Sequence, residues 1–236
     1  MLTRKNVDNT ISRLHQQIFV SEAHLQLAFA LSIDQNQFDV FPEFPAIVDG
    51  VQSEFDLLIK DRNTGSYSLV EFKYKTANHT KKPEYFELLS GQSIPLKNHS
   101  AIDLGWYDSW KDISRIEKCI LGRSYIAGKK GVINISNGFF IMITNDKGYW
   151  EKSPENSQQA VEGLYMNAGK HEAGIRKFRE KKDYRGSRND EITIENDYDF
   201  DYQSYRMLPG KYGDFRILIV EIPPLEDDSN SGFISR

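Results

Sequence analysis

The chain has 236 residues, a length that allows one large domain or two small ones. No Gly/Ser-rich or Pro-rich linker interrupts it, so we predict a single domain over residues 1–236. We expect a core at about 7–150, an extension carrying a last strand at about 151–224, and a disordered tail at 225–236. The net charge of −4 gives the whole chain no basic character, which counts against a nucleic-acid partner unless the charge is unevenly distributed.

Cysteine content and hydropathy exclude further classes of protein. Cys119 is the only cysteine, so an internal disulfide and a cysteine-only metal cage are both excluded. The N-terminal residues lack an apolar signal segment, and no stretch reaches the roughly 18 apolar residues that span a bilayer. We therefore expect no membrane partner, and a cytoplasmic location is the default expectation.

The first elements in chain order are helical. Apolar residues recur at spacings of three and four over about residues 7–33, which predicts helix. The pattern has a gap at Glu22, where Ser21 offers an N-cap for a new helix. One long helix and two shorter helices therefore both remain open.

A three-stranded antiparallel meander is expected next. Alternating side chains predict strands over 38–48, 54–60 and 66–75. Asp49-Gly50 favours a hairpin after the first strand, and the polar run at 62–65 has turn chemistry after the second.

The rest of the chain adds helices and two strands. We predict helices at 84–90, 110–121, 155–167 and 170–182, and strands at 138–144 and 215–222. The order is helix, meander, helix, strand and additions, which predicts an α/β (α+β) fold with a central mixed sheet.

Charged residues gather on one face of the meander. Strand alternation places Glu71 and Lys73 on one face of the third strand, and Asp56 lies on the second strand. If residues 62–65 form the loop, Asp56 lies opposite Glu71, whereas a three- or five-residue loop would put them on opposite faces. Facing carboxylates repel unless a cation lies between them or one is protonated. Mg²⁺ binds one or two carboxylates and completes its octahedron with water and phosphate oxygens.

These residues predict a metal site for hydrolysis of a phosphodiester. Asp56 and Glu71 would hold Mg²⁺ (or Mn²⁺). Lys73, two residues beyond Glu71 on the same face, would orient a water molecule or stabilise charge on a phosphate oxygen.

The same residues resemble a known signature. Asp56, fourteen further residues and Glu71-Phe72-Lys73 are similar to the D-xₙ-(D/E)-x-K pattern of the PD-(D/E)XK nucleases, although Phe55 replaces the usual proline. Ser21-Glu22-Ala23 resembles the helix glutamate of many members. Over roughly residues 10–145 the order of elements is similar to the family's restriction-endonuclease-like αβββαβ core.

The resemblance implies a Mg²⁺-dependent nuclease with Asp56, Glu71, Lys73 and Glu22 as its catalytic residues. It favours DNA over RNA as the substrate, and it suggests a role in restriction or phage defence. The alternative is a catalytically silent nucleic-acid-binding or assembly module with the same fold, which the acidic net charge supports. A homodimer is left open.

A basic segment follows the predicted core. Between Lys170 and Arg188, eight basic side chains stand against three acidic ones, on a predicted helix. One hypothesis is that this segment contacts phosphate. The alternative is a solvated helix neutralised by the acids at 190–201. The side chains that we predict to bind nucleic acid are Arg176, Lys177, Arg179, Lys182 and Arg185.

Overall fold

Two separate helices begin the chain. The computed structural model describes residues 1–89, 91–99, 101–122, 124–126, 133–152 and 161–224. In it α1 (Arg4–Arg13) and α2 (Glu22–Ser32) are separate helices. Ser21 caps α2 by accepting a hydrogen bond from the His24 backbone N–H. Of the two alternatives that the sequence left open, the pair of helices is confirmed.

The predicted meander is present. β1 (Phe38–Val48), β2 (Val51–Asp61) and β3 (Tyr67–Lys75) are joined in antiparallel order. Asp49 and Gly50 form the first hairpin with φ of 47° and 78°, the left-handed backbone that such two-residue turns require. The Asp61 backbone N–H bonds the Ser66 carbonyl across the second turn, so the loop has the four residues 62–65.

The meander lies within a larger mixed sheet. β7 (Ile135–Thr144) runs parallel to β3, and β14 (Asp214–Ile222) pairs antiparallel with β7. β13 (Tyr202–Met207) lies at one edge and β6 (Ser124–Ile126) at the other. The described strands give the order β13-β14-β7-β3-β2-β1-β6, so the mixed α/β class is confirmed.

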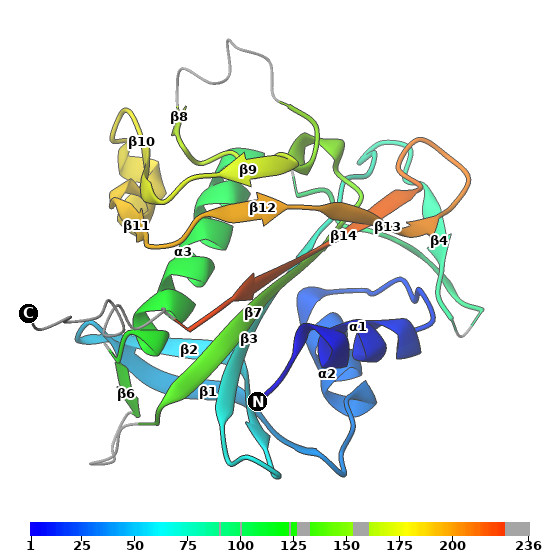
Figure 1. The fold of residues 1–236 in the computed structure, drawn as a ribbon. Helices are drawn as coiled ribbons and strands as arrows, with labels where there is room; N and C mark the ends of the chain where they lie inside the picture. Colours follow the sequence, from blue (N-terminus) through cyan, green and yellow to red (C-terminus); the bar gives the residue numbers. More distant parts are fainter. Residues whose placement is uncertain (90, 100, 123, 127–132, 153–160, 225–236) are drawn as a thin grey trace, which may run out of the picture.

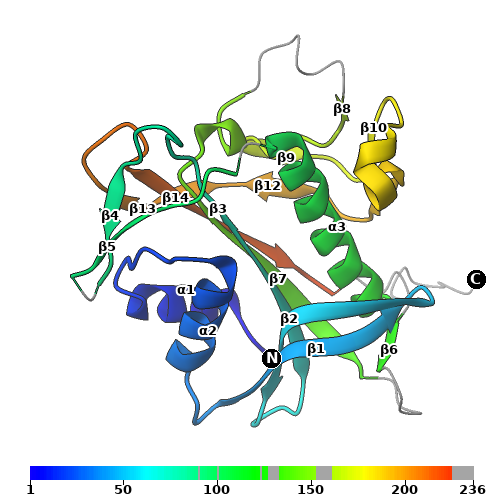
Figure 2. The same ribbon diagram turned by 180° about the vertical axis from the view of Figure 1, so that it is seen from behind.

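Helices cover both faces of this sheet (Figures 1 and 2). α1 and α2 cover one face, where Phe29 packs on Phe72 with ring centroids 5.2 Å apart. α3 (Ile102–Ile120) covers the other face, where Trp110 and Leu69 belong to one buried cluster. Alternate side chains of β3 therefore pack against different helices, as its period of two requires.

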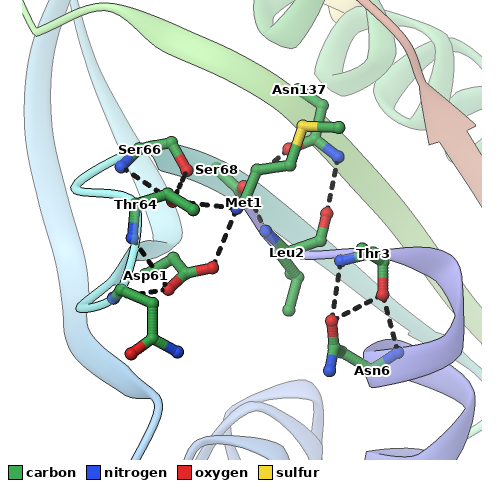
Figure 3. Close-up of polar contacts among 10 residues, drawn as sticks. Met1, Leu2, Thr3, Asn6, Asp61, Thr64, Ser66, Ser68 and Asn137 are labelled. Atoms are coloured by element: carbon green, nitrogen blue, oxygen red, sulfur yellow. Dashed lines mark hydrogen bonds and ion pairs between the residues drawn. The ribbon is translucent and has the colours of Figure 1, made fainter.

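Polar contacts hold the start of α1 against the sheet (Figure 3). The Met1 amino group lies 2.8 Å from Asp61 Oδ2. Asn137 Nδ2 donates to the Leu2 carbonyl at 2.8 Å, and Asn137 Oδ1 lies 2.6 Å from Ser68 Oγ. These contacts link the first residues to β2, β3 and β7 at the end of the sheet away from the β1–β2 hairpin tip.

The C-terminal third differs most from expectation. The helix predicted at 170–182 is wrong, because the chain forms β9 (Gly169–His171) and β10 (Gly174–Phe178) there. Burial in β10 alternates, with Arg176 and Phe178 buried, so its period is two and not 3.6. The other described elements of this part are β8 (Val161–Glu162), η2 (Asp183–Asn189), β11 (Ile192–Ile194) and β12 (Tyr198–Phe200).

Other boundaries also differ. The helix predicted at 84–90 is wrong, since β4 (Tyr85–Glu87) and β5 (Ser93–Pro95) form a hairpin there. α3 begins well before residue 110, and η1 (Lys147–Tyr149) follows β7. Of the helix predicted at 155–167, residues 155–160 lie outside the described residues and 161–167 are not helical; the tail 225–236 also lies outside them. Across the described ranges, no helix has the length and apolar character that crossing a membrane requires.

A buried glutamate attaches the C-terminal strands to α3. Glu117 is buried and accepts hydrogen bonds from the Glu195 and Asn196 backbone N–H groups, each at 3.0 Å. The Tyr198 hydroxyl donates to Glu117 Oε1 at 2.9 Å. Multiple donors offset the cost of burying this carboxylate, so it serves the packing of β11 and β12 on α3.

We predict that Gly138→Ala lowers the free energy of unfolding by about 1–3 kcal/mol, the usual cost of overpacking a core. A Cβ at this position of β7 would collide with Ile116 Cγ2 of α3 and lie 3.1 Å from the Leu69 carbonyl oxygen. Urea unfolding of Gly138→Ala, Ile116→Ala and the double variant measures the coupling. The two substitutions should cost less together than the sum of each alone; strict additivity would contradict the close contact.

Candidate active site

The central sheet opens between β2 and β3. Their ladder pairs Leu57 with Val70 and continues to Lys60 with Tyr67. Beyond Leu57 toward the hairpin tip, β2 pairs with β1, and beyond Val70 β3 pairs with β7. The register predicted from the loop is confirmed, and Asp56 and Glu71 are the next two positions, where the ladder ends.

Past the end of the β2–β3 ladder, side chains accept the hydrogen bonds of backbone N–H groups along the open edge of β3. Phe72 N–H donates to Asp56 Oδ2 at 2.6 Å, and Tyr74 N–H donates to Glu22 Oε2 at 2.9 Å. Two residues further along, the Thr76 backbone N–H donates to His99 Nδ1 at 3.1 Å. Asp56 and Glu22 each use one carboxylate oxygen in this way, because a buried backbone N–H needs an acceptor.

α3 contributes two charged residues to the same place. Arg115 Nη2 donates to Glu71 Oε1 at 2.5 Å and to Asp112 Oδ1 at 2.9 Å. Asp112 also forms an ion pair with Lys73 Nζ. Glu71, Asp112 and Arg115 therefore connect β3 to the helix above it, and Glu71 is only 2% exposed.

Lys73 lies between the acids of two elements. Its Nζ contacts Asp112 of α3 and lies 3.8 Å from Glu22 Oε1 of α2. Burial alone would lower the pKa of Lys73, but the carboxylates of Asp112, Glu22 and Glu71 outweigh it and raise that pKa. Lys73 is therefore an ammonium ion at neutral pH, suited to donating hydrogen bonds and not to accepting a proton.

The cluster carries more negative than positive charge. Four carboxylates meet two cations, Lys73 and Arg115; the carboxylates belong to Glu22, Asp56, Glu71 and Asp112. Burial raises the pKa of Asp56, against the opposing effects of the Phe72 N–H and Lys73. Burial, followed by repulsion from Asp112, raises the pKa of Glu71 although Arg115 opposes it. With all four acids ionised, the cluster would carry two negative charges in excess. The raised pKa values of Asp56 and Glu71 mean that protonation relieves part of this excess when no cation is bound.

A divalent cation would offset this excess. Asp56 and Glu71 offer hard oxygen ligands, and Asp56 Oδ2 and Glu71 Oε1 are the oxygens already engaged with the protein. Within the part of the chain that is described, no group of three or more His, Cys, Asp or Glu side chains converges as a ready-made metal cage. Mg²⁺ does not require one, since it binds through one or two carboxylates and keeps several waters.

The structure brings together the four residues predicted as catalytic, namely Glu22, Asp56, Glu71 and Lys73. It adds Asp112 and Arg115, which sequence analysis missed. A signal for both was present, since they are three residues apart and each directly precedes an apolar residue of the helix, Ile113 and Ile116. Such spacing gives a polar stripe beside the apolar one, on the helix face that meets the sheet.

The residues predicted to bind nucleic acid do not form a basic helical face. Arg176 is buried over the Trp110 ring, 4.8 Å from its centroid. Arg185 is buried 3.7 Å from the centroid of Phe178. Cation–π and backbone contacts inside the protein occupy these two guanidinium groups, because β10 turns Arg176 inward and η2 returns Arg185 over the same cluster.

The remaining three lie nearer the solvent. Lys177 Nζ lies 2.9 Å from Glu191 Oε1, an ion pair with one of the acids that follow the segment. Arg179 and Lys182 are exposed. Contact of these three with phosphate stays a prediction, on a strand and loop instead of a helix.

Comparison of this chain with protein-family models, with curated proteins and with solved structures finds no match.

We predict that Asp56→Ala is less stable to urea than Asp56→Asn, by about 1–3 kcal/mol. Alanine leaves the buried Phe72 N–H without its acceptor, whereas the asparagine side-chain oxygen can keep that hydrogen bond. Both substitutions remove the charge, so the comparison isolates the hydrogen bond. Asp39, an exposed partner of Arg62, supplies the control pair Asp39→Ala and Asp39→Asn, which should differ little. Equal stability of the two Asp56 variants would contradict a capping role.

Proposed function

We propose that this protein is a divalent-metal-dependent nuclease with a restriction-endonuclease-like core. The observation that carries the proposal is that Asp56, Glu71 and Lys73 lie together where the β2–β3 ladder ends. The order α2, β1–β2–β3, α3, β7, with β7 parallel to β3, further supports it. DNA is the proposed substrate, and restriction or phage defence the proposed setting, both from the resemblance in sequence.

Each residue of the cluster has a task in this reaction. Asp56 and Glu71 would hold the metal, which when bound lowers the pKa of a coordinated water and offsets phosphate charge. Lys73, kept protonated by its acidic neighbours, donates hydrogen bonds that orient the water or stabilise a phosphate oxygen. Glu22 holds Tyr74 N–H with Oε2, and Oε1 faces Lys73, so it positions both the strand and the ammonium group.

A specific observation favours the rival function, a catalytically silent nucleic-acid-binding or assembly module. Glu71 and Lys73 already have partners from α3, in Arg115 and Asp112. A network of this kind can connect a helix to a sheet without any ligand. Removing one member of a buried pair is then costly, because it leaves an uncompensated charge. Metal-dependent cleavage decides between the two functions.

We predict that the protein cleaves DNA with Mg²⁺ or Mn²⁺ but not with excess EDTA, and that Glu71→Gln abolishes cleavage. Glutamine keeps the size of the side chain and removes the charge that would hold the metal. Cleavage of mixed-sequence plasmid and linear DNA, followed on gels, provides the measurement. Glu54→Gln, at an exposed position of β2, serves as the matched control and should retain activity. Cleavage by wild type in EDTA, or undiminished cleavage by Glu71→Gln, would disprove the mechanism.

Lys73→Met should lower the rate of cleavage by about 100- to 1000-fold, the cost of removing one donor that stabilises developing charge. Mn²⁺ affinity, measured by calorimetry without DNA, should stay the same or increase, because the lysine is a cation and not a ligand. Lys75→Met is the control, two residues along the same face of β3. A rate close to that of wild type in Lys73→Met would rule out the role of this lysine.

A further inference from the structure

Arg115 is held rigidly at the edge of the proposed site. Its Nη2 is the atom that bonds both Glu71 and Asp112. The guanidinium carbon lies 5.1 Å from the centroid of the Phe55 ring, a residue of β2 next to Asp56. Contacts with a strand residue, a helix residue and an aromatic ring thus fix the guanidinium group. The Arg115 side chain is still 22% exposed.

Much of the hydrogen-bonding capacity of Arg115 is unused. An arginine side chain carries five N–H donors in a planar fork. Its Nε is buried and has no acceptor among the described residues. A buried donor without an acceptor is costly, but the Nε atoms of Arg176 and Arg185 are unpaired in the same way, so this atom alone does not indicate a ligand. Arg115 differs from those two because it is partly exposed and lies beside the acids of the proposed site.

A metal at Glu71 would change the role of this arginine. Arg115 now bonds Oε1 of Glu71, and a divalent cation on this carboxylate would weaken its hold on Arg115. Two positive groups compete for that carboxylate. Asp112 keeps its contact with Arg115 from the same helix, three residues earlier, so the guanidinium group stays beside the site when Glu71 is taken.

We propose that Arg115 binds a phosphate oxygen of the nucleic-acid backbone at the proposed site, once a divalent cation has taken over Glu71. The ligand class is a phosphodiester, which the planar fork of arginine fits better than an ammonium group does. Asp112 is the positioning residue that keeps both Arg115 and Lys73 directed at the site. This inference rests on the proposed nuclease function and names the residue that contacts its substrate.

Ca²⁺, which supports binding without turnover in many Mg²⁺-dependent sites, allows this contact to be measured apart from cleavage. The probe is a fluorescein-labelled duplex of mixed sequence, titrated by anisotropy at several salt concentrations, in Ca²⁺ and in EDTA. In Ca²⁺, Arg115→Met should bind the duplex about tenfold or more weakly than wild type. The slope of log affinity against log salt should fall by about 0.9, as expected for one lost phosphate contact. In EDTA the two proteins should bind alike, because Arg115 then remains on Glu71.

Two further variants make the result decisive. Lys118→Met removes a cation from the same helix, one that pairs with Asp49 away from Glu71, and should match wild type in both conditions. Arg115→Lys keeps a positive charge next to Glu71, so we expect this variant to stay folded and to replace Arg115→Met in the experiment if Arg115→Met is unstable. It lacks the fork and should also lose about tenfold in Ca²⁺.

Affinity and slope equal to wild type in Arg115→Lys or folded Arg115→Met would overturn the proposal. So would an equal loss in Ca²⁺ and EDTA, which marks a structural residue, or absence of duplex binding by wild type. Failure of wild type to cleave in Mn²⁺ is a separate result. It overturns the nuclease function, and the binding comparison still reads out the Arg115 contact.

Discussion

The open edge of β3 is the constraint on which the site depends. Where β2 leaves the ladder, the N–H groups of Phe72 and Tyr74 lose their strand partner, and carboxylates accept their hydrogen bonds instead. Asp56 comes from β2 and Glu22 from the first turn of α2 on one face of the sheet, while Asp112 and Arg115 reach the same place from α3 on the other face. Because backbone groups buried without acceptors are costly, the same acids that could serve chemistry also complete the sheet.

Closing α3 over this edge creates a problem of buried charge. Glu71 lies beneath the helix, and Lys73 and Arg115 compensate only part of the negative charge around it. Charges removed from water are stable only when they are paired and hydrogen-bonded. A cation between the acids, as we propose, would offset the remaining negative charge; protonation of Asp56 or Glu71 is the alternative when none is bound. In the structure, the ion pairs of Lys73 and Arg115 with Asp112 and Glu71 join the cluster to α3.

The sequence predicted the part of the site that short-range chemistry determines. Asp49-Gly50 and the four-residue loop at 62–65 set the register of the meander, and that register brings Asp56 beside Glu71. The spacing of Asp112 and Arg115 gives a polar stripe, but their pairing with Lys73 and Glu71 could not be predicted, since it depends on how α3 packs over the sheet. The basic segment misled for a related reason. The sequence predicted a helix with the basic side chains on its surface. In the structure Gly174 has a φ of 132°, and the chain continues from it as a strand in which Arg176 is buried.

A crystal structure of the protein soaked with Mn²⁺, with the metal located by its anomalous scattering, tests the central claim most directly. The account predicts one Mn²⁺ bound by Asp56 and Glu71, with water completing its octahedron and the Arg115 guanidinium group displaced from Glu71 Oε1 while still bonded to Asp112. The account would be contradicted if a crystal saturated with Mn²⁺ showed no anomalous signal at these carboxylates and kept the Arg115–Glu71 and Lys73–Asp112 ion pairs. The cluster would then be an ion-pair network that joins α3 to the sheet.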